Sequence, residues 1–185
     1  MSEEIAEIAA EISDRLRKNG RTVAVAESLT SGSLACHLGA AAEASKWFAG
    51  GITAYARSVK FEVLGVDPGP VITAACARQM ADGVARLTHA DFAVAITGVG
   101  GPDPEEGHPA GTVFAAVHTA VRTEASEYHF SGRPETVVKS SLPPSPTIQR
   151  HISAWPGYVG LRWNPSASHS SAVCRGAVRQ RRLTV

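Results

Sequence analysis

The sequence has little cysteine and no long apolar run. Its 185 residues include three cysteines, Cys36, Cys76 and Cys174, without C-x-x-C spacing. This pattern argues against a disulfide framework or a cysteine zinc site and favours a reducing cytoplasm. No segment approaches the roughly 18 consecutive apolar residues of a membrane helix. The acidic start, Met1 to Ile5, lacks the basic and apolar regions of a signal peptide, so we expect a cytoplasmic protein without a membrane partner.

The chain also lacks a strong net charge. It has 18 lysines and arginines against 17 acidic residues, a formal net charge of +1, so no overall basic field favours nucleic acid as a partner. The charge is unevenly divided, because residues 141–185 contain six arginines, no lysine and no acid. That stretch is rich in proline and serine and has little periodicity, so we expect it to be poorly ordered. We therefore predict one folded domain over residues 1–140, followed by an atypical tail.

Apolar periodicity predicts alternating strands and helices over most of residues 1–140. The predicted strands are residues 22–26, 47–56, 92–96, 111–118 and 125–130. The predicted helices are residues 3–18, 33–38, 57–64 and 73–87, and one that begins near residue 133. Thr73 is the expected cap of the fourth helix, and Gly50-Gly51 marks a bulge or a close backbone approach in the second strand. This order favours an α/β fold with three layers (α/β/α) and a mixed, mostly parallel sheet of about five strands, the last two forming an antiparallel hairpin.

The polar turn after the first predicted strand carries a candidate nucleophile. Ser28 and Thr30 stand in the sequence Ser-Leu-Thr-Ser-Gly between strand 22–26 and helix 33–38. A hydroxyl at a helix start lies beside free N–H groups and the positive end of the helix dipole, which favour an alkoxide or a bound anion. Serine and threonine are also ordinary helix caps, and a cap is the commoner role. Both interpretations of Ser28 stay open at this point.

A tyrosine and a lysine follow the second predicted strand. Tyr55 stands at the end of that strand and Lys60 in the first turn of the next helix. Lysine can serve as a general base for a serine where burial depresses its pKa toward neutrality, and Tyr55 could then relay a proton or orient the amine. An exposed lysine beside a half-buried tyrosine is the commoner arrangement. Arg57 is likewise a candidate phosphate contact or an ordinary surface charge.

A glycine-rich loop, Thr97-Gly-Val-Gly-Gly-Pro102, follows the third predicted strand. Its N–H groups can form an anion-binding nest or an oxyanion hole. The loop matches neither G-x-x-x-x-G-K-[ST] nor G-x-G-x-x-G, because prolines interrupt it and no helical pattern follows, so a mononucleotide kinase or a Rossmann dehydrogenase is disfavoured. The seven histidines lack metal-binding spacing, so no metal is predicted.

Three segments taken together resemble one protein family. AESLTSG at 26–32, SKWFAGGITAYARSVKFEVLGV at 45–66 and AITGVGGPDPEEGHPAGTVFAAV at 95–117 are similar, in order and spacing, to the CinA C-terminal domain family, the nicotinamide-nucleotide amidases. The likeness extends over residues 5–139. It implies a three-layer fold with a mixed sheet. It also implies hydrolysis of the carboxamide of nicotinamide mononucleotide to nicotinate mononucleotide and ammonia, a salvage step, without metal or cofactor.

The resemblance also implies roles for individual residues. It maps a serine and lysine pair onto Ser28 and Lys60, with Tyr55 as the tyrosine of the same motif, and it makes a small-molecule nucleotide the expected partner. The expected substrate-binding residues lie in the same three segments: Glu27, Thr30, Ser31, Gly32, Gly50, Gly51, Arg57, Thr97, Gly98, Gly100 and Gly101. The substrate phosphate is expected at the helix start 30–32 or at the loop 98–101. The sequence leaves open whether the chain forms a homo-oligomer.

The chain departs from the family pattern at three positions and in its tail. Ser31 stands where glycine is usual, Arg57 where asparagine is usual, and His108 where a basic residue is usual. These departures keep open a second function, that of a nucleotide-binding homologue without turnover. The match ends near Ser140, inside the last helix, and we hypothesise that a frameshift has replaced the rest. A third alternative is that the basic tail is an interaction arm for nucleic acid.

Overall fold

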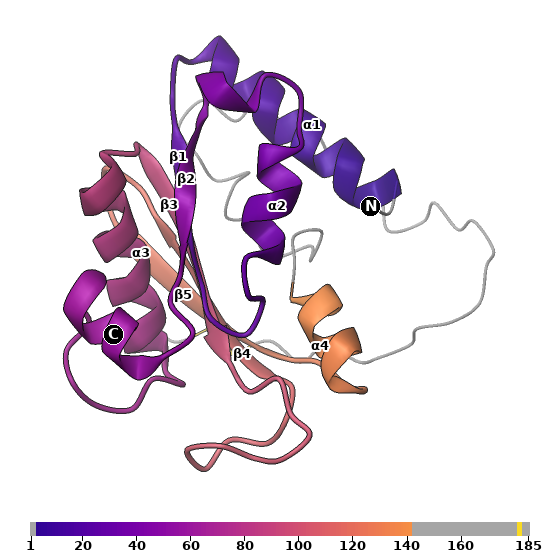
Figure 1. Ribbon diagram of the computed structural model, residues 1–185, viewed down its shortest axis with the longest axis vertical. Coiled ribbons are helices and arrows are strands. Elements are labelled where there is room, and N and C mark those ends of the chain that lie inside the picture. Colours follow the sequence, from indigo (N-terminus) through magenta and orange to yellow (C-terminus); the bar gives the residue numbers. More distant parts are fainter. Residues whose placement is uncertain (1–2, 142–180, 183–185) are drawn as a thin grey trace.

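The computed structural model describes residues 3–141 and 181–182, which form one sheet between two layers of helices (Figure 1). The helices are α1 (Glu3–Lys18), α2 (Ser33–Gly39), α3 (Ala74–Thr88) and α4 (Pro134–Ser140). The strands are β1 (Val23–Glu27), β2 (Phe48–Thr53), β3 (Phe92–Gly98), β4 (Thr112–His118), β5 (Thr123–His129) and β6 (Arg181–Arg182). A 3₁₀ turn at Ala44–Lys46 and a π-helical turn at Val59–Val63 complete the described elements.

The strand order in the sheet is β2-β1-β3-β4-β5-β6. Strand β1 pairs in parallel with β2 and β3, whereas β4, β5 and β6 each run antiparallel to the preceding strand. The expected three layers, the mixed sheet and the β4–β5 hairpin are therefore confirmed. The expectation of about five strands is also confirmed, with the two-residue β6 as a sixth strand, whereas the expectation of mostly parallel pairing needs a correction. The described sheet has six strands, and only the part formed by β1, β2 and β3 is paired in parallel.

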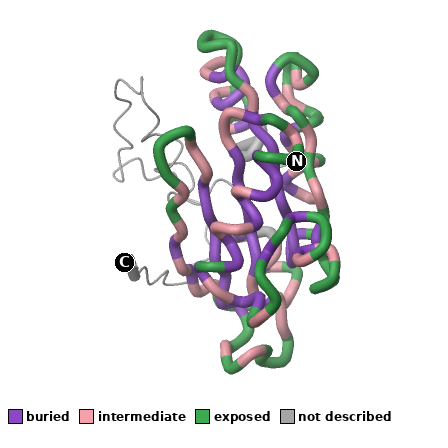
Figure 2. Tube along the Cα trace, turned by 90° about the vertical axis from the view of Figure 1, so that its left-hand side faces the viewer, coloured by how far each residue is buried: buried purple, intermediate pink, exposed green. Residues whose placement is uncertain are grey.

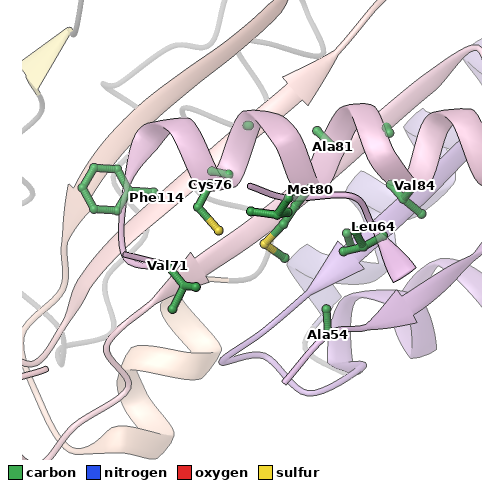
Figure 3. Packing of buried hydrophobic residues seen from close by; sticks show 14 of the residues in the cluster. Ala54, Leu64, Val71, Cys76, Met80, Ala81, Val84 and Phe114 are labelled. Carbon is green, nitrogen blue, oxygen red and sulfur yellow. The ribbon is translucent and has the colours of Figure 1, made fainter. Parts of the chain in front are cut away.

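Alternate residues of β1 and β3 face opposite layers, because successive side chains of a strand point to opposite faces. Those in the core on the α3 side are Ala24, Ala26, Ala93 and Ala95. Those in the core on the side of α1, α2 and α4 are Val23, Val25, Val94 and Ile96. The alanines leave room for α3 to pack closely on the sheet through Met80 and Val84 (Figure 3). Burial is therefore concentrated along the strands, and exposure along the connecting loops (Figure 2).

The parallel half of the sheet brings the three motif segments to one edge. Glu27, at the end of β1, is paired with Thr53 of β2 on one side and Ile96 of β3 on the other. The segments that follow are the turn at 28–32, the stretch 54–60 and the glycine-rich loop from 97 onward. They start side by side, because the carboxyl ends of parallel strands meet at the same edge of a sheet.

Three local expectations can be compared with the observed backbone. Thr73 caps α3, its Oγ1 accepting the N–H of Cys76 at 3.0 Å, as predicted. The helix predicted over 57–64 is confirmed over residues 57–63, where an α-helical start at 57–58 continues as the π-helical turn at Val59–Val63. Strand β2 carries the expected irregularity, since its register with β1 shifts between Val23 and Ala24.

The predictions about the tail concern residues that lie almost wholly outside the described part of the chain. Only Ser141 and the two residues of β6 belong to residues 141–185 and are described. The poorly ordered tail, the frameshift and the boundary near residue 140 therefore stay predictions. In residues 3–141 and 181–182, no helix combines the length and apolarity needed to cross a membrane.

Candidate active site

A buried lysine contacts a serine at the carboxyl edge of the sheet. Ser28 directly follows β1, and its N–H donates to the carbonyl of Ile96 at 3.0 Å, which fixes the backbone of the turn to β3. Lys60 is 1% exposed, and its Nζ lies 2.9 Å from Ser28 Oγ. The amine also donates to the carbonyls of Ala54, at 2.5 Å, and Tyr55, at 3.2 Å.

These three contacts are open to a charged amine, which can donate to all three oxygens, and also to a neutral one. An uncharged lysine has two N–H donors and one lone pair, so it can donate to both carbonyls and accept the hydroxyl proton of Ser28. Desolvation by burial lowers the pKa of Lys60, and the charge of Arg57 acts in the same direction. Charges on Cys76, Glu105 and Glu106 act in the opposite direction and raise it. Burial is the largest of these influences, so the amine is biased toward its neutral, basic form.

Cys76 is the thiol that acts on the pKa of this lysine, and its own high pKa keeps it mostly uncharged at neutral pH. It lies at the start of α3 and is 2% exposed, beside Val71 and Met80 in the core (Figure 3). Burial raises the pKa of its thiol to about 11. A thiolate would stabilise a charged Lys60, but the thiolate is scarce at neutral pH. Because the thiol is neutral, Cys76 does little to counteract the lowering of the Lys60 pKa by burial.

The backbone of Tyr55, rather than its phenol, contacts the lysine. Its carbonyl accepts from Lys60 Nζ, whereas its side chain is 68% exposed. The structure thus brings Ser28 and Lys60 together but leaves the Tyr55 ring at the surface. A role of the phenol in relaying a proton stays a prediction, while the orientation of the amine rests on two backbone carbonyls. The sequence gives no signal for carbonyl acceptors, because every residue has one.

Glu27 holds the turn that carries Ser28. Its carboxylate is 1% exposed and accepts three backbone N–H groups at the start of α2: those of Gly32 at 3.2 Å, Leu34 at 3.0 Å and Ala35 at 2.7 Å. These N–H groups are the ones that an incoming phosphate would need. An internal carboxylate already fills the helix start, so this place disfavours a substrate phosphate. We infer that Glu27 positions the turn rather than contacting substrate.

Replacing Glu27 by glutamine tests this positioning role. The glutamine NH₂ group would face at least one of the N–H donors, so we expect the free energy of unfolding to fall by about 1–3 kcal/mol. Urea unfolding measures it, with Glu43→Gln as the matched control, because Glu43 is an exposed carboxylate that pairs with Arg17 and Lys46. Equal stability of the two variants would contradict the role assigned to Glu27.

The other residues of this turn are Thr30, Ser31 and Gly32, which differ in backbone conformation and in hydrogen bonding. Ser31 and Gly32 both have positive φ, 51° and 91°, the left-handed region that favours glycine. Ser31 therefore occupies, at some cost in strain, a conformation for which the usual glycine is better suited. Thr30 is 1% exposed, and its Oγ1 is the one buried side-chain oxygen or nitrogen in the described part of the chain without a hydrogen-bond partner. A ligand or a water could satisfy this hydroxyl.

The glycine-rich loop divides into a packed part and an open part. Thr97 and Gly98 end β3; the Thr97 hydroxyl donates to the carbonyl of Val71 at 2.9 Å, and a Cβ on Gly98 would lie 2.4 Å from the carbonyl oxygen of Thr112. Gly100 has open space where its Cβ would be, whereas a Cβ on Gly101, whose φ is 89°, would lie 2.9 Å from Ala110 Cβ. The structure gives the N–H groups of these last two glycines no partner within residues 3–141. The open part is therefore the better candidate for an anion site.

The other predicted contacts lie in structural positions. Gly51 packs within β2, where a Cβ would lie 2.6 Å from Val25 Cγ2, and its neighbour Gly50, with a φ of 119°, takes part in the register shift. Arg57 is engaged in an ion pair with Glu106 at 2.7 Å and donates to the carbonyl of Gly69 at 2.6 Å. Sequence reasoning did not single out Glu106. In the described residues, no group of three or more His, Cys, Asp or Glu side chains could hold a metal ion.

The fold and the site define a three-layer α/β protein with a buried lysine held against a serine at the carboxyl edge of its sheet. The chain matches the CinA C-terminal domain family over residues 5–143, so it belongs to that family.

Curated relatives carry names that describe competence-damage inducible proteins. The chain is 39% identical over 127 residues to one from Bacillus subtilis and 40% identical over 125 residues to one from Streptococcus gordonii. These alignments cover 66% and 65% of this chain and 30% of each relative. The chain therefore spans about 30% of the length of these curated relatives.

Solved structures of the same superfamily share the fold. The competence damage-inducible protein A of Klebsiella pneumoniae has a TM-score of 0.78 at 31% identity, covering 82% of this chain and 99% of that chain. A CinA superfamily protein of Escherichia coli has a TM-score of 0.73 at 32% identity, covering 76% of this chain and 86% of that chain. The names of these proteins describe induction and not a chemical reaction.

Proposed function

We propose that this chain is an amidohydrolase that converts nicotinamide mononucleotide to nicotinate mononucleotide and ammonia. One observation carries the proposal: the buried Nζ of Lys60 lies 2.9 Å from the hydroxyl of Ser28. Burial lowers the pKa of Lys60, so the amine can accept a proton at a pH where an exposed lysine cannot. The family resemblance supplies the substrate, and the geometry supports the chemistry.

The proposed reaction runs in two stages. Lys60 takes the hydroxyl proton of Ser28 as the oxygen attacks the carboxamide carbon, and N–H groups at the carboxyl edge of the sheet stabilise the oxyanion. The protonated amine then gives its proton to the leaving nitrogen, and ammonia departs from an acyl-enzyme. Water, deprotonated by the same lysine, attacks the ester; the lysine then gives this proton to the leaving Ser28 oxygen, and the acid product leaves as its carboxylate after losing its own proton to solvent.

We assign the two ends of the substrate by asking which backbone N–H groups already have a hydrogen-bond partner within the chain. Glu27 fills the N–H groups at the start of α2, whereas those of Gly100 and Gly101 lack partners in the described chain. We therefore place the phosphate at the glycine-rich loop rather than at the helix start. The unpartnered hydroxyl of Thr30 is two residues from Ser28, so it is our candidate contact for the carboxamide end.

Ammonia release from nicotinamide mononucleotide tests the proposal. We expect turnover by the purified protein, with nicotinate mononucleotide formed in equal amount, as measured by an ammonia assay and chromatography of the products. Nicotinamide riboside, which lacks the phosphate, is the matched substrate control and should react more slowly. A folded protein that binds the nucleotide in calorimetry but releases no ammonia would overturn the amidase. That result would instead support a nucleotide-binding homologue without turnover. Two observations favour this alternative: the ion pair of Arg57 with Glu106 and the positive φ of Ser31.

A further inference from the structure

Arg57 and Glu106 connect three segments around the candidate site. Arg57 lies in the stretch that leads to Lys60, and its guanidinium donates to Glu106 Oε1 at 2.7 Å and to the carbonyl of Gly69 at 2.6 Å. Glu106 lies in the long loop between β3 and β4, which begins with the glycine-rich motif. The ion pair therefore ties this loop to the stretch that carries the lysine and to the loop that precedes α3.

Glu106 uses its two oxygens for two different purposes. Oε1 accepts from Arg57, while Oε2 accepts the N–H groups of Val71, at 2.7 Å, and Ile72, at 2.9 Å. The carbonyl of Val71 in turn accepts the hydroxyl of Thr97, at the end of β3. A chain of hydrogen bonds thus runs from Arg57 through Glu106 and Val71 to the strand end that lies beside Ser28. The Glu106 side chain is 15% exposed, so its bonds to Val71 and Ile72 are partly sheltered from water, whereas the Arg57 side chain is 54% exposed and its bond to Glu106 faces solvent.

The two charges of the pair act on Lys60 with opposite signs. Arg57 lowers the pKa of the amine and Glu106 raises it. The other groups that act on the amine are the thiol of Cys76 on α3 and the carboxylate of Glu105, both of which raise its pKa when charged. Ser28, Ala54 and Tyr55 contact it through uncharged oxygens. With both members of the pair present, their effects on the amine oppose each other.

We propose that Arg57 and Glu106 are a positioning pair for the serine and lysine site, holding the glycine-rich loop against the lysine segment and balancing the charge beside the amine. The catalytic part of this inference rests on the proposed amidase function. The contact that Arg57 and Glu106 make between the loops, called the clasp below, does not depend on that function. The pair acts through the loop and the amine, because its hydrogen bonds in the described residues join Arg57 and Glu106 to each other and to the backbone of Gly69, Val71 and Ile72. In this chain Arg57 is thus committed to an internal carboxylate rather than to a phosphate.

Two single substitutions separate this role from simple structural support. Arg57→Gln leaves the Glu106 carboxylate unbalanced, so the pKa of Lys60 should rise and the pH at which kcat/KM reaches half its plateau should move up. Glu106→Gln can keep one oxygen for Val71 and Ile72 but leaves Arg57 unbalanced, so the same midpoint should move down. Loss of structure alone would not move the two midpoints in opposite directions.

The clasp can be measured without turnover. Hydrogen exchange at the Val71 and Ile72 amides should be about fivefold faster in Arg57→Gln. The reason is that the Glu106 carboxylate, which accepts both N–H groups, loses its ion pair with Arg57. The NMR signal of the Lys60 Cε carbon reports the protonation of the amine, and its titration should show the same opposite shifts. Lys18→Gln, which removes an exposed ion pair with Asp14 on α1, is the matched control and should change none of these values.

The outcomes distinguish this inference from the proposed function. Opposite shifts of the Lys60 titration together with faster exchange support the positioning pair, even if the wild-type protein releases no ammonia. Shifts of one sign, no shifts, or exchange equal to that of wild type in Arg57→Gln overturn it, even if the protein is an active amidase. If the wild-type protein releases no ammonia but the two variants shift the Lys60 titration in opposite directions, the result counts against the amidase alone.

Discussion

Replacing Ser28 by alanine is expected to lower ammonia release from nicotinamide mononucleotide by about ten-thousandfold or more, because the variant has no hydroxyl to attack the carboxamide. The measurement is single-turnover and steady-state ammonia release by the purified variant. The fold should survive, since the N–H of Ser28 keeps its bond to Ile96 and only the side-chain contact with Lys60 is lost.

Ser126→Ala provides the matched control for this substitution. Ser126 is a buried serine on β5, 5% exposed, in the antiparallel half of the sheet. Its replacement should leave turnover within about twofold of wild type, as expected for a buried change away from the reacting groups. Full activity in Ser28→Ala would assign the nucleophile to another residue, such as Thr30, or to water.

Replacing Lys60 by methionine is expected to lower kcat by about a hundredfold to ten-thousandfold, the usual contribution of a positioned general base. Methionine has nearly the same length and no charge, so it fills the buried space without a stranded ammonium. Ser28 would then lack a proton acceptor, while the carbonyls of Ala54 and Tyr55 would lose their donor. Lys46→Met removes an exposed lysine that pairs with Glu43 and should keep wild-type kcat. An active Lys60→Met variant would exclude the lysine as the base.

The same variant should change how stability depends on pH. Burial lowers the pKa of Lys60 in the folded state from its ordinary value of 10.5, so between the two pKa values the unfolded chain binds more protons. The Lys60 contribution to the free energy of unfolding should therefore increase as pH rises from the folded-state pKa toward 10.5. This increase should be absent in Lys60→Met, as measured by urea unfolding at several pH values. Identical pH dependence in the two proteins would contradict a depressed pKa.

The candidate site was only partly predictable from sequence. The motif at 26–32 and the Tyr55-to-Lys60 spacing identified Ser28 and Lys60, but each had a commoner structural interpretation that the sequence alone did not remove. The contact between them spans 32 residues of sequence and depends on how the ends of β1 and β2 meet. Glu27 was expected to bind substrate, which stays a prediction, and the sequence did not reveal that its carboxylate accepts three N–H groups at the start of α2. The local sequence around an acidic residue before a polar turn does not predict whether its carboxylate will be buried.

Arg57 shows the same limit at longer range. The sequence offered it as a phosphate contact or a surface charge, whereas its partner Glu106 is 49 residues away. That pairing requires the loop between β3 and β4 to fold back over the stretch after β2. Ion pairs between loops depend on the path of both backbones, and local pattern does not record that path.

By itself, the sequence determined the three-layer α/β class, the order of most strands and helices, and the segments in which chemistry would be found. Those features follow from local periodicity, glycine and proline placement, and the residues of the motifs. The tertiary structure alone decided that Lys60 is buried against Ser28, that Glu27 fills the start of α2, and that Arg57 is paired with Glu106. The physical reason is desolvation: whether a side chain is charged, neutral or paired depends on which distant segments exclude water from it.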